Sequence, residues 1–328
     1  MTRAADLADL GSAYGGYNGF GFRNALINGS MQIVQRNYPF SIAPSTGPIT
    51  IDRWGVYSAG ATLSVTRGAG DGDRFPYSLE VTGAAGSTAC NVFQRIESSH
   101  ASAFVNRPAT LSARVYLSAP KTVSWYIGTP FAATDNYTGS PTVTSIANGS
   151  FGTLPAGWST ISVTVENLGA NAYKGLEVCI FTGGVGVGET FRVTGVQFEL
   201  GREATPFEFR PQAIERLMCQ RYYQHGLSLA PHGEGFSYER AAAAFTGQTY
   251  VTKTSPFVVP MRTAPSVAIY AGGAAGVYVQ GVTGNDTGWQ LYTSGLAGGR
   301  GGVTIWKNNV TIPQGYVVSF DWIADAEL

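Results

Sequence analysis

Apolar and polar residues alternate, or run apolar without a break, over several short stretches in the first two thirds of the chain. The clearest are residues 111–117, 122–127, 160–165, 176–181 and 191–200. These lengths and periods are typical of β-strands with one or both faces buried. Clusters of Gly, Pro, Asn and Ser separate the stretches, and no helical pattern falls between them. The pattern therefore predicts an all-β chain, with a jelly-roll-like antiparallel β-sandwich over residues 23–212.

One helical pattern interrupts the strands, between Pro211 and Gly226. Proline suits the first turn of a helix and glycine its end. The apolar residues between them follow the spacing i, i+3, i+4, i+8 and form one stripe: Ile214, Leu217, Met218 and Tyr222. We predict a short helix over residues 213–224. It would either pack on the sandwich or lie at a subunit interface and couple two β modules.

These patterns divide the chain into four parts. Residues 1–22 hold a short helix-like segment, which is marginal alone, and a Gly-rich linker. The sandwich follows, and then a connecting helix and linker over residues 213–236. Strand patterning resumes beyond it and predicts a second, smaller β domain over residues 237–328. No repeat of about 20 to 50 residues is visible, which argues against a β-helix or a propeller.

Charge and composition exclude several kinds of partner. Lys and Arg number 21 and Asp and Glu also 21, so the chain has no net field to attract nucleic acid or an anionic membrane. No apolar run approaches the ~20 residues that a membrane span needs, and the first residues carry no secretory pattern. We expect no nucleic-acid partner, no membrane insertion, and synthesis in a cytoplasm.

The three cysteines, Cys90, Cys179 and Cys219, are widely spaced and odd in number. This pattern is typical of small buried hydrophobes rather than of a disulfide framework. A Cys90–Cys179 bridge remains an open alternative.

Residues with catalytic or metal-binding chemistry do not fall into recognised patterns. The histidines lack the spacing of a zinc site, no GxSxG or phosphate loop occurs, and the glycines of residues 183–189 indicate a turn. No spacing rule links the carboxylates of the sandwich, which favours solvated positions over a glycosidase pair: Glu97, Glu166, Glu177, Glu189 and Glu199. We expect no enzymatic activity, no cofactor and no metal. The DGD of residues 71–73 is the one weak hint of calcium, and a turn explains it equally well.

Two segments carry a family resemblance. "NALINGSMQIVQRN" (residues 24–37), followed by "ITIDRW" (49–54), resembles the start of a module common in tailed-bacteriophage fibre and other virion appendage proteins. "FELGREATPFEFRPQAIERLMCQRYYQ" (198–224) is similar to the end of that module. "AADLADL" near the N-terminus, "PFVVPMRTAPSVAIY" and the final "DAEL" are similar to other parts of such proteins.

The resemblance implies a carbohydrate-binding-module-like β-sandwich in a homotrimeric virion fibre that contacts bacterial surface polysaccharide. Residues 1–22 would then be the anchor that binds other virion proteins. A purely structural fibre or spike, without receptor contact, is the alternative, and a polysaccharide depolymerase is the enzymatic one. The motif residues themselves suit a scaffold: Trp54 as a core anchor, with Asp52 and Arg53 fixing the end of a strand.

Sugar rings stack on aromatic side chains, and their hydroxyls need amide, carboxylate or backbone partners. Aromatic residues beside such groups are therefore the candidates for glycan binding: Tyr137, Trp158, Trp289, Tyr292 and Trp306. Trp158 directly precedes a predicted strand, which favours a structural role for it. Burial of these rings would favour structure, and exposure would favour binding.

Overall fold

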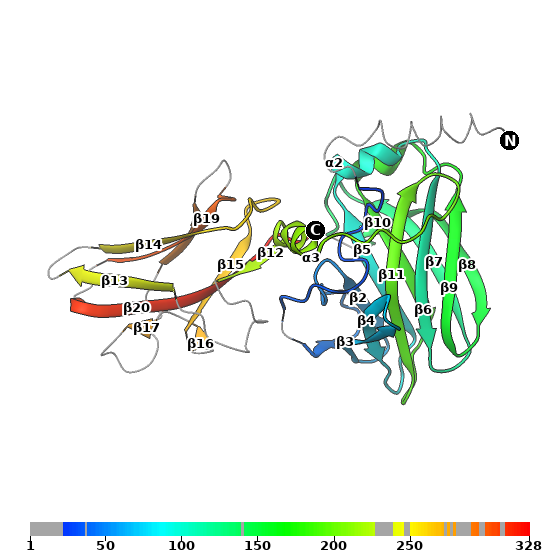
Figure 1. The fold of residues 1–328 in the computed structure, drawn as a ribbon, viewed down its shortest axis with the longest axis horizontal. Helices are drawn as coiled ribbons and strands as arrows, with labels where there is room; N and C mark the ends of the chain where they lie inside the picture. Colours follow the sequence, from blue (N-terminus) through cyan, green and yellow to red (C-terminus); the bar gives the residue numbers. More distant parts are fainter. Residues whose placement is uncertain are drawn as a thin grey trace. The chain divides into compact units, whose positions relative to one another are not determined.

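The structure is a computed structural model of the whole chain. It describes residues 22–36, 38–138, 141–226, 239–245, 250–271, 274–275, 278–279, 290–294, 299–308 and 312–328. The predicted N-terminal helix lies outside these residues. The chain forms two compact units (Figure 1). The first holds the described residues up to Gln32, Tyr38–Pro211 and Leu328, and the second holds Ile33–Asn37 and Gln212–Glu327.

The first unit is built from two antiparallel sheets. Sheet A has the order β1-β3-β4-β11-β6-β9, and sheet B has the order β2-β5-β10-β7-β8 (Figure 1). The strands of sheet A are β1 (Phe40–Ile42), β3 (Leu63–Asp71), β4 (Phe75–Thr82), β6 (Ala109–Leu117), β9 (Gly157–Val165) and β11 (Thr190–Leu200). Those of sheet B are β2 (Gly55–Ala59), β5 (Ala89–Ile96), β7 (Lys121–Pro130), β8 (Val143–Leu154) and β10 (Leu176–Gly183).

Burial alternates along these strands as a sandwich requires. In β6, Leu111, Ala113 and Val115 are buried, while Ser112 and Arg114 between them are partly exposed. Short helical turns make some of the connections: α2 (Ser98–Ala101), η1 (Ser102–Phe104) and η2 (Ala170–Lys174). The predicted all-β fold and antiparallel sandwich are confirmed, and each of the five predicted strand stretches lies in a strand.

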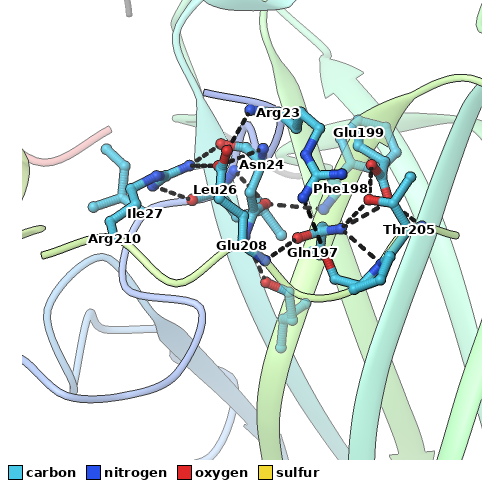
Figure 2. Close-up of polar contacts among 12 residues, drawn as sticks. Arg23, Asn24, Leu26, Ile27, Gln197, Phe198, Glu199, Thr205, Glu208 and Arg210 are labelled. Carbon is cyan, nitrogen blue, oxygen red and sulfur yellow. Dashed lines mark hydrogen bonds and ion pairs between the residues drawn. The ribbon is translucent and has the colours of Figure 1, made fainter. Parts of the chain in front are cut away.

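The two motifs that begin and end the sandwich lie side by side (Figure 2). The side chain of Asn24 donates to the Val196 carbonyl and accepts from the Phe198 amide, at 3.0 Å each, and Val196 and Phe198 belong to β11. The carboxylate of Glu208 accepts from the backbone amides of Arg23 and Asn24, also at 3.0 Å. These bonds join residues more than 170 positions apart, with separations of 172 to 185, so the motifs act together to close the sandwich.

Arg210 completes this closure from the end of the second motif. It is buried and donates from Nη1 to the Leu26 carbonyl at 3.0 Å, and from Nη2 to the Asn24 carbonyl. A buried guanidinium needs such acceptors, because leaving it without partners would cost several kcal/mol. The charged residues of these motifs therefore have a structural role.

The ITIDRW motif is a core anchor, as predicted. Trp54 is 1% exposed, and its indole N–H donates to the Asn28 carbonyl at 2.9 Å. The Asn28 side chain in turn donates to the Asp52 carbonyl, and the Arg53 guanidinium donates to the Arg95 carbonyl in β5. Arg53 adopts a positive φ of 72°. This conformation and these bonds tie the tight turn before β2 to the neighbouring strand.

The second unit contains α3 (Gln212–Gln220), and the other regular elements among its described residues are strands. Its main sheet has the order β12-β20-β15-β16, with β13 and β17 also pairing with β20, and a three-stranded sheet has the order β14-β19-β18 (Figure 1). The strands are β12 (Tyr223–His225), β13 (Glu239–Phe245), β14 (Tyr250–Pro256), β15 (Ser266–Ala271), β16 (Ala274–Ala275), β17 (Tyr278–Val279), β18 (Gln290–Ser294), β19 (Gly302–Asn308) and β20 (Ile312–Asp325). The segment Ile33–Asn37 lies within the predicted sandwich range of residues 23–212, but it belongs to this unit.

The connecting helix differs from its prediction in length and in its buried side. It ends at Gln220, because residues 223–225 form β12 and pair with β20. Ile214 and Leu217, from the predicted buried stripe, are 37% and 39% exposed. Glu215 and Cys219 are the buried residues of the helix. The apolar spacing located the helix but did not identify the side that this chain covers.

The three cysteines are buried free thiols, so the Cys90–Cys179 bridge does not form. Burial raises the pKa of Cys90 to about 12, despite the opposing charge of Lys121. Within the described residues, no helix is long and apolar enough to cross a bilayer, and no three His, Cys, Asp or Glu side chains gather as metal ligands.

Candidate functional site

The outer face of sheet B carries a row of aromatic and amide side chains. The pairing of its strands places Tyr57 beside Asn91, Asn91 beside Phe181, and Phe181 beside Ser124. Ser150 of β8 ends the row. Tyr57, Asn91, Phe181 and Ser124 are partly exposed, and Ser150 is exposed. Four steps of about 4.8 Å between strands give the row a length of about 19 Å.

A second row lies one side-chain step away on the same face. It consists of Gly55, Phe93, Cys179, Tyr126 and Asn148. Phe93 fills the position above Gly55, where any added Cβ would lie only 2.3 Å from its ring. Phe93 and Cys179 are buried, whereas Tyr126 is partly exposed and Asn148 is exposed. The accessible part of this row is therefore its end near β7 and β8.

Tyr126 joins the two rows. Its ring centroid lies 5.9 Å from that of Phe181, with the ring planes tilted by 50°. Its hydroxyl donates to Oε1 of Glu177 at 2.7 Å. The hydroxyl is thereby fixed, and burial with the nearby carboxylate raises the pKa of Tyr126 well above its usual range. A fixed ring beside a second aromatic ring is a rigid surface on which a flat apolar ligand face can stack.

Glu177 is the centre of a polar cluster at one end of the face. Its Oε2 forms an ion pair with Arg95 Nε at 2.7 Å. The Arg95 guanidinium also lies 5.0 Å from the ring centre of Phe93 and 4.4 Å from that of Tyr137. Glu177 is 3% exposed. Both of its oxygens are thus occupied, one by Tyr126 and one by Arg95.

The loop that carries Tyr137 lies against this cluster. Asp135 accepts from the amide and hydroxyl of Ser98 at 2.7 and 2.6 Å, which fixes the loop to the start of α2. Tyr137 is 6% exposed, and burial raises its pKa well above the usual range. Within the described part of the chain, its hydroxyl has no hydrogen-bond partner. Its ring is held between the loop and Arg95, so it is not available as an open stacking surface.

The other predicted candidates lie apart from this face. Trp158 is partly exposed on β9 of sheet A, and its ring centroid lies 5.5 Å from that of Tyr116 on β6. Trp289 lies outside the described residues. Tyr292 and Trp306 lie on the paired strands β18 and β19 of the second unit, but their side chains are also outside the described part. Their roles as glycan-binding residues remain predictions.

The carboxylates of the sandwich are less solvated than the sequence suggested. Glu97, Glu177 and Glu199 are buried. Glu199 accepts from the amide and hydroxyl of Thr205 at 2.8 and 2.6 Å, so it holds the chain between β11 and the second motif. Glu166 is the exposed case, in an ion pair with Arg202. The donors to Glu177 come from Arg95 and Tyr126 on distant strands, which no local spacing shows, whereas Thr205 lies only six residues from Glu199.

Glu189 stabilises the Gly-rich turn of residues 183–189. It accepts from Lys121 Nζ and from the Gly186 amide at 2.7 Å each. Lys121 also donates to the Gly184 carbonyl. The Lys121 hydrogen bond and the Gly186 amide hold the pKa of Glu189 below its ordinary value. The turn interpretation is therefore correct, and the carboxylate is part of it.

Sequence reasoning missed the residues of the sheet B face. Tyr57, Asn91, Tyr126 and Phe181 come from four strands, and none stands in an aromatic-rich loop. In β10 the run LEVCIF is apolar almost throughout, so Phe181 looked like a core residue. The available signal was the alternation of side chains along a strand. Phe181 lies an even number of residues from Glu177 and therefore points to the same face of the sheet, whereas the core residues Val178 and Ile180 point to the other face.

No protein-family model and no curated protein matches this sequence. Solved structures with some likeness include the enzymatically active domain of tailspike protein 4 from bacteriophage CBA120, with 17% identity, a TM-score of 0.35, and coverage of 54% of this chain and 21% of that one. Another is a putative sugar-binding protein from Bacteroides thetaiotaomicron, with 13% identity, a TM-score of 0.38 and coverage of 55% and 100%. A third is a xylan-binding domain from Paenibacillus barcinonensis, with 13% identity, a TM-score of 0.31, and coverage of 52% of this chain and 99% of that one. Identity and TM-score are low in each case, so these likenesses carry no conclusion about ligand or activity.

Proposed function

We propose that this protein is a bacteriophage virion appendage that attaches to glycans on a bacterial surface without cleaving them. The observation that carries the proposal is the row of Tyr57, Asn91, Phe181, Ser124 and Ser150 on the outer face of sheet B. Rings for stacking alternate there with amide and hydroxyl groups for hydrogen bonds, the combination that a sugar requires. The motif resemblance supports the virion as its location.

Attachment by such a face requires several copies. A shallow saccharide site binds with a Kd on the order of 1 mM, which corresponds to a binding free energy of about 4 kcal/mol. Three identical sites in a homotrimer raise the avidity by about 10² to 10⁴. The exposed apolar side chains Ile214 and Leu217 on α3 support such an assembly, because contact with other copies would cover them. Residues 1–22 would contact other virion proteins.

Binding without cleavage is supported by the hydrogen bonding of the carboxylates. Glycoside hydrolysis needs one carboxylic acid and one carboxylate that both face the sugar. Glu177, the one carboxylate on the sheet B face, has each oxygen in a short polar contact with Tyr126 or Arg95. Its role there is to fix neighbouring side chains.

The test is competition with adsorption. Purified full-length protein should bind cells of a susceptible bacterium and slow phage adsorption to them. Phe181→Ala should weaken binding by about tenfold or more, since it removes a stacking ring. Trp158→Ala is the matched control, because it removes a partly exposed ring on the opposite sheet.

The outcomes distinguish the alternatives. A loss of binding with Trp158→Ala, and none with Phe181→Ala, would move the site to sheet A. If the protein binds no host surface and phage adsorption is unchanged, the alternative function, a structural fibre without receptor contact, would be favoured. Release of oligosaccharides from host polysaccharide over hours would make the protein a depolymerase.

A further inference from the structure

The charged side chains on the sheet B face neutralise one another. Among the outward-facing positions of β2, β5, β10, β7 and β8, two carry a charge, Arg95 and Glu177. They are neighbours in register and form the 2.7 Å ion pair. The other outward positions hold uncharged polar, aromatic or small residues. The outward side chains of these five strands therefore carry no net charge.

Neither charged group is left to bind an ionic ligand. Glu177 is occupied at both oxygens, and the Arg95 guanidinium contacts Glu177, the rings of Phe93 and Tyr137, and the main-chain oxygen of Leu328. An acidic sugar would lose part of its hydration on this face without gaining a cation in return, which is unfavourable. A neutral sugar needs what the open part of the face presents, namely rings, amides and hydroxyls.

We infer that the sheet B face takes an uncharged saccharide and discriminates against uronate, sulfate and phosphate groups. This inference rests on the proposed function of the same face. It has a measurable consequence: binding depends little on ionic strength, because stacking and neutral hydrogen bonds are not screened as charge pairs are. Attachment through an acidic polymer would weaken steeply as salt is added.

The experiment compares two panels of polymers with the purified full-length protein. The uncharged panel is galactan, glucomannan and dextran, and the acidic panel is alginate, hyaluronan and polygalacturonate. Surface polysaccharide from a susceptible bacterium is added in native and carboxyl-reduced forms. We expect binding to at least one uncharged or carboxyl-reduced polymer, with less than about a twofold change in Kd between about 50 and 500 mM NaCl.

Two variants connect the result to this face. Phe181→Ala should weaken binding to the uncharged polymer about tenfold without changing its salt dependence. Glu177→Gln leaves Arg95 without its anionic partner and should shift preference toward the acidic panel, with salt-dependent binding. Circular dichroism and thermal unfolding confirm that both variants are folded. If Glu177→Gln does not fold, the salt titration of the unmodified protein decides alone.

The possible results separate the two proposals. Preference of the unmodified protein for acidic polymers, weakened by salt, would overturn the inference while leaving glycan attachment in place. Binding to no polymer and to no host surface would overturn the attachment function itself, and the inference with it. Preference for uncharged polymers that Phe181→Ala leaves unchanged would overturn the assignment to this face.

Discussion

Arg36 and Asp325 form an ion pair in which Nη2 and Oδ2 lie 2.9 Å apart, although 289 positions separate the two residues. The Arg36 guanidinium also lies over the ring of Tyr223, 3.8 Å from its centre. Arg36 comes from the first family-like motif and Asp325 from the last, and both belong to the second unit. The strand pair β12–β20 is thus held by a segment from near the start of the chain.

Arg36→Ala should destabilise the second unit by about 1 to 3 kcal/mol, because Asp325 loses its cationic partner and the Tyr223 ring loses its contact with the guanidinium. Chemical unfolding followed by tryptophan fluorescence measures the change. Arg202→Ala is the control, since its pair with Glu166 is well exposed and should contribute less than about 1 kcal/mol. Equal effects of the two substitutions would contradict a structural role for Arg36.

Asn24→Ala should destabilise the sandwich more strongly, by about 2 to 5 kcal/mol. Its side chain satisfies the Val196 carbonyl and the amides of Leu26 and Phe198, and alanine would leave all three buried without that partner. Asn167→Ala removes one exposed turn bond, to Gly169, and should cost less than about 1 kcal/mol. The midpoint of urea unfolding of each variant gives the comparison.

Tyr126→Phe and Tyr137→Phe form a matched pair of substitutions. The Tyr126 hydroxyl donates to buried Glu177, so its removal should cost about 1 to 3 kcal/mol. The Tyr137 hydroxyl has no partner among the described residues, so its removal should be neutral or stabilising. Thermal unfolding should therefore order the proteins as Tyr137→Phe at or above the unmodified chain, and Tyr126→Phe below it. The reverse order would exclude the hydrogen-bond assignment.

The stability contributed by Glu189 should depend on pH. Lys121 and the Gly186 amide lower its pKa in the folded state, so the carboxylate binds protons less readily there than in the unfolded chain. The contribution is then present in full above the unfolded pKa, and it is lost as pH falls through the folded pKa, below about pH 4. The difference in unfolding free energy between the unmodified protein and Glu189→Gln should shrink over that range. Glu203→Gln, which removes a carboxylate at an exposed position, is the control.

Leu217→Asp tests whether α3 contacts other copies of the chain. Leu217 is 39% exposed in one chain, so a charge there should change the stability of a monomer by less than about 1 kcal/mol. If a trimer covers this side of the helix, the same substitution should dissociate it. Light scattering gives the mass of both proteins. A monomeric unmodified protein at micromolar concentration would contradict the trimer, and an intact Leu217→Asp trimer would place the interface elsewhere.

The sequence by itself determined five strands of the sandwich, the position of the helix and the role of Trp54. These depend on local signals: the period of two along β6, β7, β9, β10 and β11, and an apolar spacing after Pro211. Tertiary structure alone decided which side of α3 is buried, that Glu177 is buried between Arg95 and Tyr126, and that Tyr137 lies beneath a guanidinium. It also brought Tyr57, Asn91 and Phe181 into one row. The physical reason is that the burial of a side chain, and the hydrogen bonds of its polar atoms, depend on partners from distant strands. The alternation along one strand shows only that the strand has an apolar and a polar face.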